Sequence, residues 1–188
     1  SEADRRAEQI LKIELSKARP DFSMLLEEEG FVGAETASDC WIVDPLDGTT
    51  NFLHGIPHFA ISIAHIQNDQ LEAGMVYDPT RDETFWATRG GGCFLNNTRL
   101  RVSARRSLNS AVLATGIPFG NRAGKEEMLN ALVPVMNKTA GVRRFGAASL
   151  DLAYLAAGRF DAFWEIGLSP WDVAAGILMV REAGGLVS

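Results

Sequence analysis

The order of apolar and polar positions predicts a chain of mixed helices and strands. In segment 5–17, Ala7, Ile10, Leu11 and Leu15 recur near a helical period. Short or alternating apolar runs predict strands elsewhere. These runs occupy the apolar part of 22–30 and the segments 41–43, 59–66, 71–77, 84–88, 92–95, 111–115, 142–145 and 160–165.

Turn residues and helical periods organise these segments. The strands 59–66 and 71–77 flank a short QNDQ turn, which predicts a hairpin. Further helices are predicted at 126–138, interrupted or kinked at Pro134, at 147–157, amphipathic and ended by Gly158, and at 171–183, mostly apolar. Hairpins early and strand–helix alternation late predict a layered α+β fold with mixed sheets. We expect one structural unit with two sub-domains, residues 1–105 and 106–188.

Composition and charge argue against a nucleic-acid-binding or membrane-spanning protein. The chain has 188 residues, 46% of them hydrophobic, and a formal net charge of −6, which disfavours nucleic acid as the main partner. No apolar run approaches the ~20 residues that span a bilayer. Cys40 and Cys93 form neither a metal pattern nor a disulfide framework, so we expect a reducing, cytoplasmic compartment. Because an apolar run is just starting at the last residues, we expect the chain to be the middle of a longer protein.

The stretch CWIVDPLDGTTNF, residues 40–52, carries the most specific chemistry. Asp44 follows directly after an apolar run, and Pro45 favours a turn that places Asp47 on the same side of the chain as Asp44. Carboxylates and the Leu46 carbonyl are hard oxygen ligands that suit Mg²⁺, and Gly48 lets the backbone approach a ligand closely. This combination suits phosphoryl transfer to water. An acidic turn capped by Thr49 is the ordinary alternative.

Other acids have ordinary explanations when each is taken alone. The run 27–29, three glutamates after an apolar strand, is typical of a solvated loop. Asp172 begins an apolar helix, where the helix dipole favours an acid. Asp4 precedes a helix and is a candidate N-cap.

In chain order, these acids form a set that resembles the inositol monophosphatase family, and its bacterial members in particular. The family pattern is an Asp, a Glu-Glu pair, D-P-[IL]-D-G-T and W-D-x-x-A. This chain has Asp4, Glu27–Glu28, Asp44–Thr49 and Trp171–Ala175 in that order. LATGIPF, GAASLDLAYLAAGRFDAFWEIGL and VREAGG extend the match. The resemblance implies a stack of layers, α-β-α-β-α.

The resemblance also implies two or three Mg²⁺ ions per site. Glu27, Asp44 and the Leu46 carbonyl would hold the first ion. Asp44, Asp47 and Asp172 would hold the second, and Glu27 with Glu28 a third. The implied catalytic residues are Asp4, Glu27 and Thr49, with Thr49 oriented by Asp4 so that it positions the attacking water.

A further set would bind the substrate. Gly48 and Thr49 would offer their N–H groups to the phosphate, while the positions around Gly146 and Glu165 would line the polyol hydroxyls, with Arg143 nearby. The complete substrate set is Glu27, Leu46, Asp47, Gly48, Thr49, Arg143, Gly146, Ala147, Ala148, Glu165 and Asp172.

The resulting hypothesis is a Mg²⁺-dependent, lithium-sensitive phosphomonoesterase that acts on inositol 1-phosphate or a similar polyol phosphate. Histidinol phosphate, fructose 1,6-bisphosphate and a nucleotide 3′-phosphate stay open as substrates. A regulatory protein that contacts RNA polymerase or RNA, with an incidental phosphatase site, is the alternative from another class. The resemblance also implies a homodimer, to which strands between residues 59 and 95 would contribute.

Overall fold

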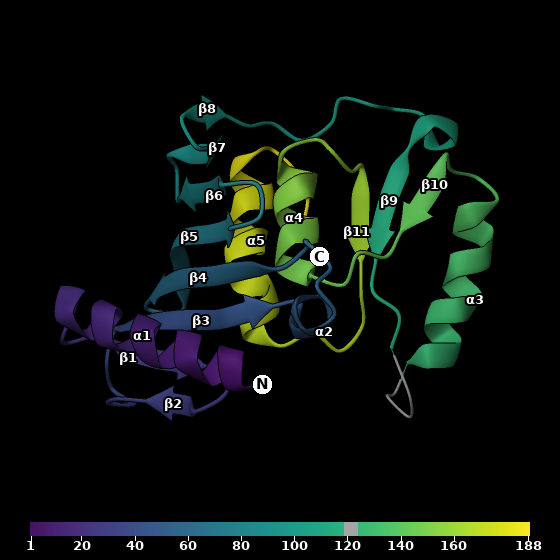
Figure 1. Ribbon diagram of the computed structural model, residues 1–188. Coiled ribbons are helices and arrows are strands. Elements are labelled where there is room, and N and C mark those ends of the chain that lie inside the picture. The colour runs from purple at the N-terminus through teal and green to yellow at the C-terminus, as the bar shows by residue number, and fades with distance from the viewer. Residues whose placement is uncertain (119–123) are drawn as a thin grey trace.

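A computed structural model describes residues 1–118 and 124–188. These residues form two sheets, and the larger one has eight strands. Their spatial order is β2-β1-β3-β4-β5-β6-β7-β8, and the sheet is mixed because β1 and β3 are parallel while the other neighbours are antiparallel (Figure 1). The strands are β1 (Ser23–Leu26), β2 (Gly30–Val32), β3 (Asp39–Asp47), β4 (Ala60–Gln67), β5 (Gln70–Asp78), β6 (Glu83–Thr88), β7 (Gly92–Leu95) and β8 (Thr98–Arg99).

The second sheet is small and parallel. Its order is β10-β9-β11, formed by β9 (Val112–Thr115), β10 (Gly141–Arg143) and β11 (Ala162–Trp164). The 3₁₀ turn η1 (Leu108–Ser110) leads into β9, and α3 (Lys125–Met136) lies on the outer side of this sheet (Figure 1).

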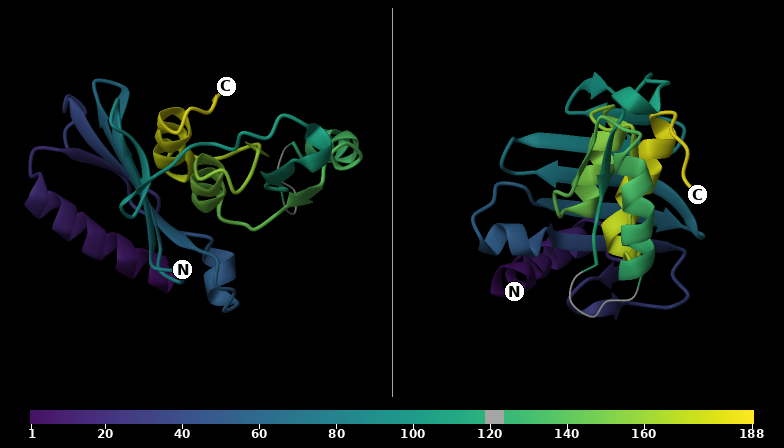
Figure 2. Two further views of the ribbon diagram at one scale, coloured as in Figure 1. Left: turned by 90° about the horizontal axis from the view of Figure 1, so that it is seen from above. Right: turned by 90° about the vertical axis from the view of Figure 1, so that its right-hand side faces the viewer.

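The helices complete a layered arrangement. α1 (Glu2–Ala18) covers one face of the large sheet, while α4 (Ala148–Ala156) and α5 (Pro170–Glu182) lie between the two sheets (Figure 2). The short α2 (Thr49–Leu53) follows β3 directly. The expected α-β-α-β-α layers are therefore confirmed. In the described part of the chain, no helix is long and apolar enough to cross a membrane.

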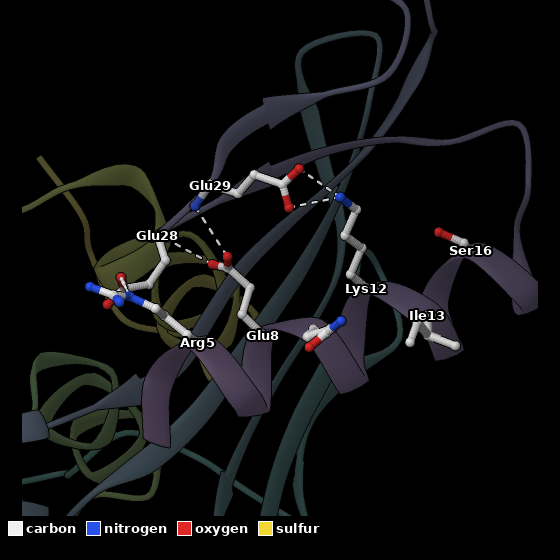
Figure 3. Close-up of a pocket in the computed structure, with 8 residues that line it drawn as sticks. Arg5, Glu8, Lys12, Ile13, Ser16, Glu28 and Glu29 are labelled. Carbon is white, nitrogen blue, oxygen red and sulfur yellow. Dashed lines mark hydrogen bonds and ion pairs between the residues drawn. The ribbon is translucent and has the colours of Figure 1, made fainter. Parts of the chain in front are cut away.

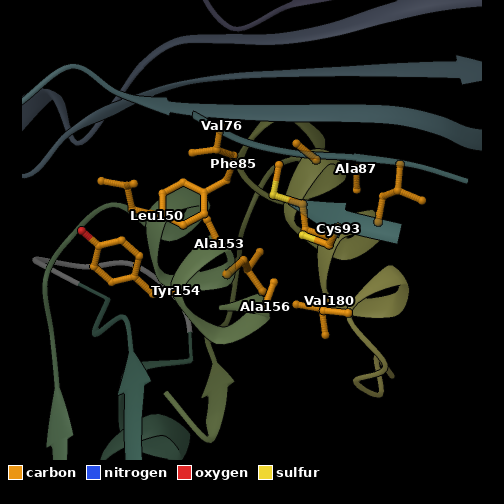
Figure 4. Close-up of a cluster of buried hydrophobic side chains, with 14 of the residues drawn as sticks. Val76, Phe85, Ala87, Cys93, Leu150, Ala153, Tyr154, Ala156 and Val180 are labelled. Atoms are coloured by element: carbon orange, nitrogen blue, oxygen red, sulfur yellow. The ribbon is translucent and has the colours of Figure 1, made fainter. Parts of the chain in front are cut away.

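The main core lies between the large sheet and the two central helices. Val76 and Phe85 from the sheet meet Leu150 and Ala153 of α4, and all four side chains are fully buried (Figure 4). Removing this apolar surface from water supplies the main driving force for stacking the layers. Glycine lets the layers approach closely, because a Cβ on Gly74 of β5 would lie 2.9 Å from the Cα of Ala175 in α5.

Periodicity predicted several elements correctly. The first helix, the 59–77 hairpin and the apolar last helix are all present. The hairpin turn has two residues with positive φ, Asn68 at 48° and Asp69 at 62°, the backbone of a type I′ turn. Gly158, with φ of 70°, follows α4 as the predicted helix stop.

Three expectations were wrong in detail. The 147–157 helix is not amphipathic: nearly every residue of α4 is buried, because sheets and α5 surround it. α3 runs without interruption through Pro134 and ends at Met136, two residues before the predicted end at 138. The short strand 41–43 is part of β3, which runs on to Asp47. Phe119, the end of the LATGIPF motif, lies outside the described residues.

Candidate active site

The carboxyl end of β3 carries two buried aspartates. β3 pairs regularly with β4 up to Asp44, and its register shifts before Asp47 pairs with Ala60. Pro45 lies in this irregular stretch, where its missing N–H cannot continue the ladder. The N–H of Leu46 donates to Asp44 Oδ1 over 2.9 Å. The irregularity thus fixes the orientation of Asp44 and brings both acids to the end of the strand.

Gly48 makes the sharp connection from β3 to α2. Its φ of +89° is in the left-handed region, which favours glycine. A Cβ here would lie 3.1 Å from the carbonyl oxygen of His58 and 3.3 Å from the Cβ of Ala147. Both conformation and space therefore require glycine between Asp47 and Thr49.

Asp4 and Thr49 meet although they are 45 residues apart. The hydroxyl Oγ1 of Thr49 lies 2.7 Å from Asp4 Oδ1 and 3.1 Å from the carbonyl oxygen of Leu46. Asp4 is 1% exposed. Burial alone would raise the pKa of Asp4, but hydrogen bonds from Ser1 and Thr49 outweigh it and hold that pKa below its usual value. Asp4 is thus an ionised acceptor for the threonine hydroxyl.

The three glutamates of 27–29 have three different environments. Glu27 is directed inward and interacts with Asp44. Glu28 is exposed, and its carboxylate lies 3.4 Å from the Arg5 guanidinium. Glu29 pairs with Lys12 of α1 through oxygen–nitrogen distances of 2.6 and 2.7 Å (Figure 3). The structure brings Glu27 into the cluster and leaves Glu28 at its rim.

The clustered acids raise one another's pKa. For Asp44, burial followed by repulsion from Asp47 and Glu27 raises the pKa to about 10. For Asp47, burial raises the pKa to about 7, against two hydrogen bonds from Ser149. Burial, together with the nearby Asp172 and Asp4, also raises the pKa of Glu27. The site therefore disfavours the ionised form of these acids unless a cation neutralises them.

The carboxylate and carbonyl oxygens of the site are donors of the type that Mg²⁺ prefers, although they do not surround a common point. Within residues 1–118 and 124–188, no group of three or more His, Cys, Asp or Glu side chains is arranged so that it could hold a metal ion as it stands. Yet Glu27 Oε2 is buried without a hydrogen-bond partner, and the neighbouring carboxylates repel each other strongly. Like charges favour a wider spacing when no cation lies between them, and the carboxylate and carbonyl oxygens gathered here are the donors that Mg²⁺ prefers.

Asp172 reaches the cluster from the first turn of α5. Its Oδ2 accepts a hydrogen bond of 2.7 Å from the N–H of Ser169, which begins the helix. Its charge raises the pKa of both Glu27 and Asp47. The ordinary helix-start role and the predicted place beside the other acids therefore coexist in this residue.

A cavity of about 700 Å³ opens beside the acids. Its described lining includes Glu27 and Asp172, with Glu165 just beyond β11 and Ser169 before α5. The arginine in this lining is Arg144, whereas the guanidinium of the predicted Arg143 donates to the Val142 carbonyl. The sequence placed the right segment here, but it did not identify which of two adjacent arginines faces the cavity.

The loop before α4 brings the remaining predicted residues close to α2. A Cβ on Gly146, whose φ is +84°, would lie 2.6 Å from Nη1 of Arg144. Ala147 lies next to Gly48, and Ala148 is the first residue of α4. These three positions therefore lie between the β3–α2 connection and the cavity arginine.

Two supporting residues were missed by sequence reasoning. Ser149 donates from its backbone N–H to Asp47 Oδ2 over 2.7 Å, and its hydroxyl donates to the same oxygen over 2.5 Å. The side-chain amide of Asn51 donates to the carbonyls of His58 and Phe145, each over 2.8 Å. The only sequence signal was their position inside the DPLDGTTNF and GAASLD stretches.

Comparisons with known proteins show what this chain is similar to. A model of the inositol monophosphatase family matches residues 1–188. An inositol-1-monophosphatase of Mesorhizobium japonicum is 55% identical over 188 residues, covering 100% of this chain and 71% of that protein. A Nus factor SuhB of Pseudomonas aeruginosa is 55% identical over 192 residues, with 100% and 71% covered. The solved structure of the extragenic suppressor protein suhB from Bartonella henselae has a TM-score of 0.93 and 56% identity, covering 96% of this chain and 69% of that one.

Proposed function

The chain belongs to the inositol monophosphatase family, and from this premise we propose that it hydrolyses inositol 1-phosphate or a similar polyol phosphate with Mg²⁺ as cofactor. It is a phosphoric monoester hydrolase. One observation carries the proposal. The acidic cluster of Glu27, Asp44 and Asp47 lies beside the hydrogen-bonded pair of Thr49 and Asp4.

Asp4 and Thr49 orient the water that attacks phosphorus. A hydroxyl has a single proton, and the ionised Asp4 is the stronger of its two acceptors at Thr49. With that proton directed to Asp4, the oxygen lone pairs of Thr49 are left to accept from water. This holds the water in a fixed direction, which lowers the entropic part of the barrier.

The acids supply the proposed cation sites. Glu27, Asp44 and the Leu46 carbonyl are proposed for one Mg²⁺, and Asp44, Asp47 and Asp172 for a second, with Glu28 completing a third beside Glu27. Bound Mg²⁺ would neutralise phosphate charge and make water a better nucleophile at neutral pH. Asp44 contributes to two of these sites, and Ser149 keeps Asp47 in place for its own.

The substrate occupies the remaining polar positions. The N–H groups of Gly48 and Thr49 are proposed to bind phosphate oxygens. Glu165 is proposed to accept hydrogen bonds from two polyol hydroxyls, since a carboxylate is an acceptor at both oxygens. Arg144, in the cavity lining, adds a cation that suits a phosphorylated ligand.

The test is phosphate release from inositol 1-phosphate, histidinol phosphate, fructose 1,6-bisphosphate and a nucleotide 3′-phosphate. We expect release that requires Mg²⁺, stops with EDTA, falls with millimolar Li⁺ and is strongest for inositol 1-phosphate. Stronger release from another of these substrates would support phosphatase activity but assign the chain a different substrate. No release in any reaction, with Mg²⁺ binding retained in calorimetry, would refute the enzymatic proposal for these substrates.

A regulatory role is the second candidate, since a relative with 55% identity is named a Nus factor. In this role the chain would contact RNA polymerase or RNA, and phosphate release would be incidental. The acidic net charge of −6 does not favour RNA as a direct partner. Complementation with Asp44→Asn separates the roles: a transcriptional phenotype that survives loss of the phosphatase supports regulation, and its loss counts against it.

Two properties of the whole protein are part of the proposal. A homodimer, with strands between residues 59 and 95 at its interface, is tested by the mass in solution. A cytoplasmic location is proposed because Cys40 and Cys93 are free thiols, which suits a reducing compartment. Fractionation of cells checks this second property.

A further inference from the structure

Glu8 is a buried acid with an unusual pair of partners. It lies on α1 one turn after Asp4 and is only 5% exposed. Its Oε2 accepts from the backbone N–H of Glu28 over 2.9 Å, and its Oε1 accepts from the N–H of Glu29 over 3.1 Å (Figure 3). One carboxylate therefore holds two consecutive peptide groups of another element.

The segment held by Glu8 is the one that presents Glu27. Residues 27–29 form the loop of the β1–β2 hairpin, since Leu26 pairs with Gly30. Gly30, with φ of +83°, takes the left-handed conformation that closes short hairpin loops. So short a loop has little backbone freedom, and fixing the peptides of Glu28 and Glu29 fixes the direction in which Glu27 leaves the chain.

The loop needs such an anchor because its negative charges are repelled by the acids around it. It carries three adjacent glutamates. Asp172, Asp4 and Glu28 repel the Glu27 carboxylate, and a hydrogen bond with Asp44 only partly compensates. Lys12 pairs with Glu29 and Arg5 with Glu28, so α1 also neutralises the outer two acids. Asp4, Glu8 and Lys12 are spaced four apart and share one helix face. That face contacts Thr49 at one end and the hairpin loop at the other.

We propose that Glu8 is a positioning residue: through the backbone of Glu28 and Glu29, it holds Glu27 in place beside Asp44. This inference rests on the proposed function, because Glu27 is the acid that would bind Mg²⁺. A carboxylate is required at position 8 because two N–H groups need two acceptor oxygens. A glutamine has one acceptor oxygen, and its NH₂ group would face the other peptide N–H, which would remain unpaired in a partly buried place.

The test compares Glu8→Gln with Glu14→Gln. Glu14 lies on the same helix and pairs with Lys17, but both side chains are exposed, so its substitution is the matched control. We expect Glu8→Gln to raise the Mg²⁺ concentration for half-maximal binding and activity about 10- to 100-fold, as loss of a ligand's supporting partner does. Amide exchange of Glu28 and Glu29 should rise roughly tenfold or more, as for peptides that open locally. The control should change neither quantity.

Several outcomes would decide against the proposal. Unchanged exchange at Glu28 and Glu29 would mean that no anchor exists, and faster exchange with an unchanged Mg²⁺ curve would mean an anchor without a role at the site. If Glu8→Gln does not fold, Glu8→Asp keeps both acceptors on a shorter side chain. It should give a smaller rise in both quantities, and no rise would overturn the proposal. Calorimetry with Mg²⁺ alone and amide exchange need no turnover, so they test Glu8 even if no substrate is hydrolysed.

Discussion

At the scale of residues, Asp44 concentrates the electrostatics of the site. It is 2% exposed, its Oδ1 accepts from Leu46 N–H, and burial with its acidic neighbours raises its pKa to about 10. An uncompensated carboxylate in this place is unfavourable, whereas a carboxylate between cations is favourable. The residue therefore makes sense as a ligand shared by two ions.

Asp44→Asn should lower kcat by roughly 1,000-fold or more, since charge stabilisation by bound ions contributes several kcal/mol to the transition state. Turnover is measured at saturating Mg²⁺ and substrate. Because the substitution removes an acid whose ionised form is unfavourable in this buried place, the cation-free variant should unfold at or above the wild-type temperature. Near-normal turnover would refute the assignment of Asp44 as a metal ligand. If the variant unfolds at a lower temperature than the wild type, the loss of activity would instead be due to a destabilised fold.

At the scale of elements, the site depends on how β3 ends and how α2 begins. The register shift at Pro45 and the left-handed Gly48 turn the chain within a few residues. Asp47 and Thr49 consequently reach different partners, Ser149 of α4 and Asp4 of α1. The connection between these two elements thus links α2 to α4 and to α1 beside the acids.

Gly48→Ala should destabilise the protein by about 2–4 kcal/mol, since it adds steric conflict to left-handed strain of roughly 1–2 kcal/mol. Gly55→Ala is the matched control: its φ is +68°, yet a Cβ there would meet nothing within 4 Å. Urea unfolding of both variants measures the difference. Equal losses would show that conformation alone matters at Gly48, without the contacts to His58 and Ala147.

At the scale of the whole molecule, α4 and α5 hold the two sheets together. Buried residues of both helices join side chains from the large sheet and from β9 in one cluster. The helices approach closely at Gly176, where a Cβ would lie 2.4 Å from the Cβ of Leu152. Asp172 is on α5, so this packing also determines how that acid meets the acids of β3.

Gly176→Ala should destabilise the protein by about 1–3 kcal/mol, because overpacking outweighs the gain in helix propensity of roughly 1 kcal/mol. Adding Leu152→Ala removes the Cδ1 and Cγ atoms, which would lie 2.6 and 3.0 Å from the new Cβ, and keeps the Cβ of residue 152. The conflict is thus partly relieved, and the two substitutions should be less harmful together than the sum of their separate effects. A double-mutant cycle of unfolding free energies measures this coupling. Strict additivity would mean that the helices do not meet at this point.

Much of the fold and of the candidate site was readable in advance. The 3.6-residue period marked α1, a mostly apolar run marked α5, strands around a short QNDQ turn marked β4 and β5, and DPLDGT marked two acids and the glycine that follows them. These features are local: backbone sterics and the distribution of apolar side chains decide them within a few residues. Arg143 and Arg144 show the limit of such sequence-based prediction. They are adjacent residues of the same type, and only their surroundings in the folded protein distinguish them.

The sequence by itself determined most of the helices and strands, though not the short β2 and β8, and which acids are available for a metal site. Only the tertiary structure decided that α4 is buried on nearly all sides, that Ser149 holds Asp47 across 102 residues, and that Glu8 anchors the loop of Glu27. The physical reason is that burial and hydrogen-bond partners depend on layers brought together from distant parts of the chain. A local pattern specifies the chemistry that a residue can offer, and packing specifies the partner that receives it.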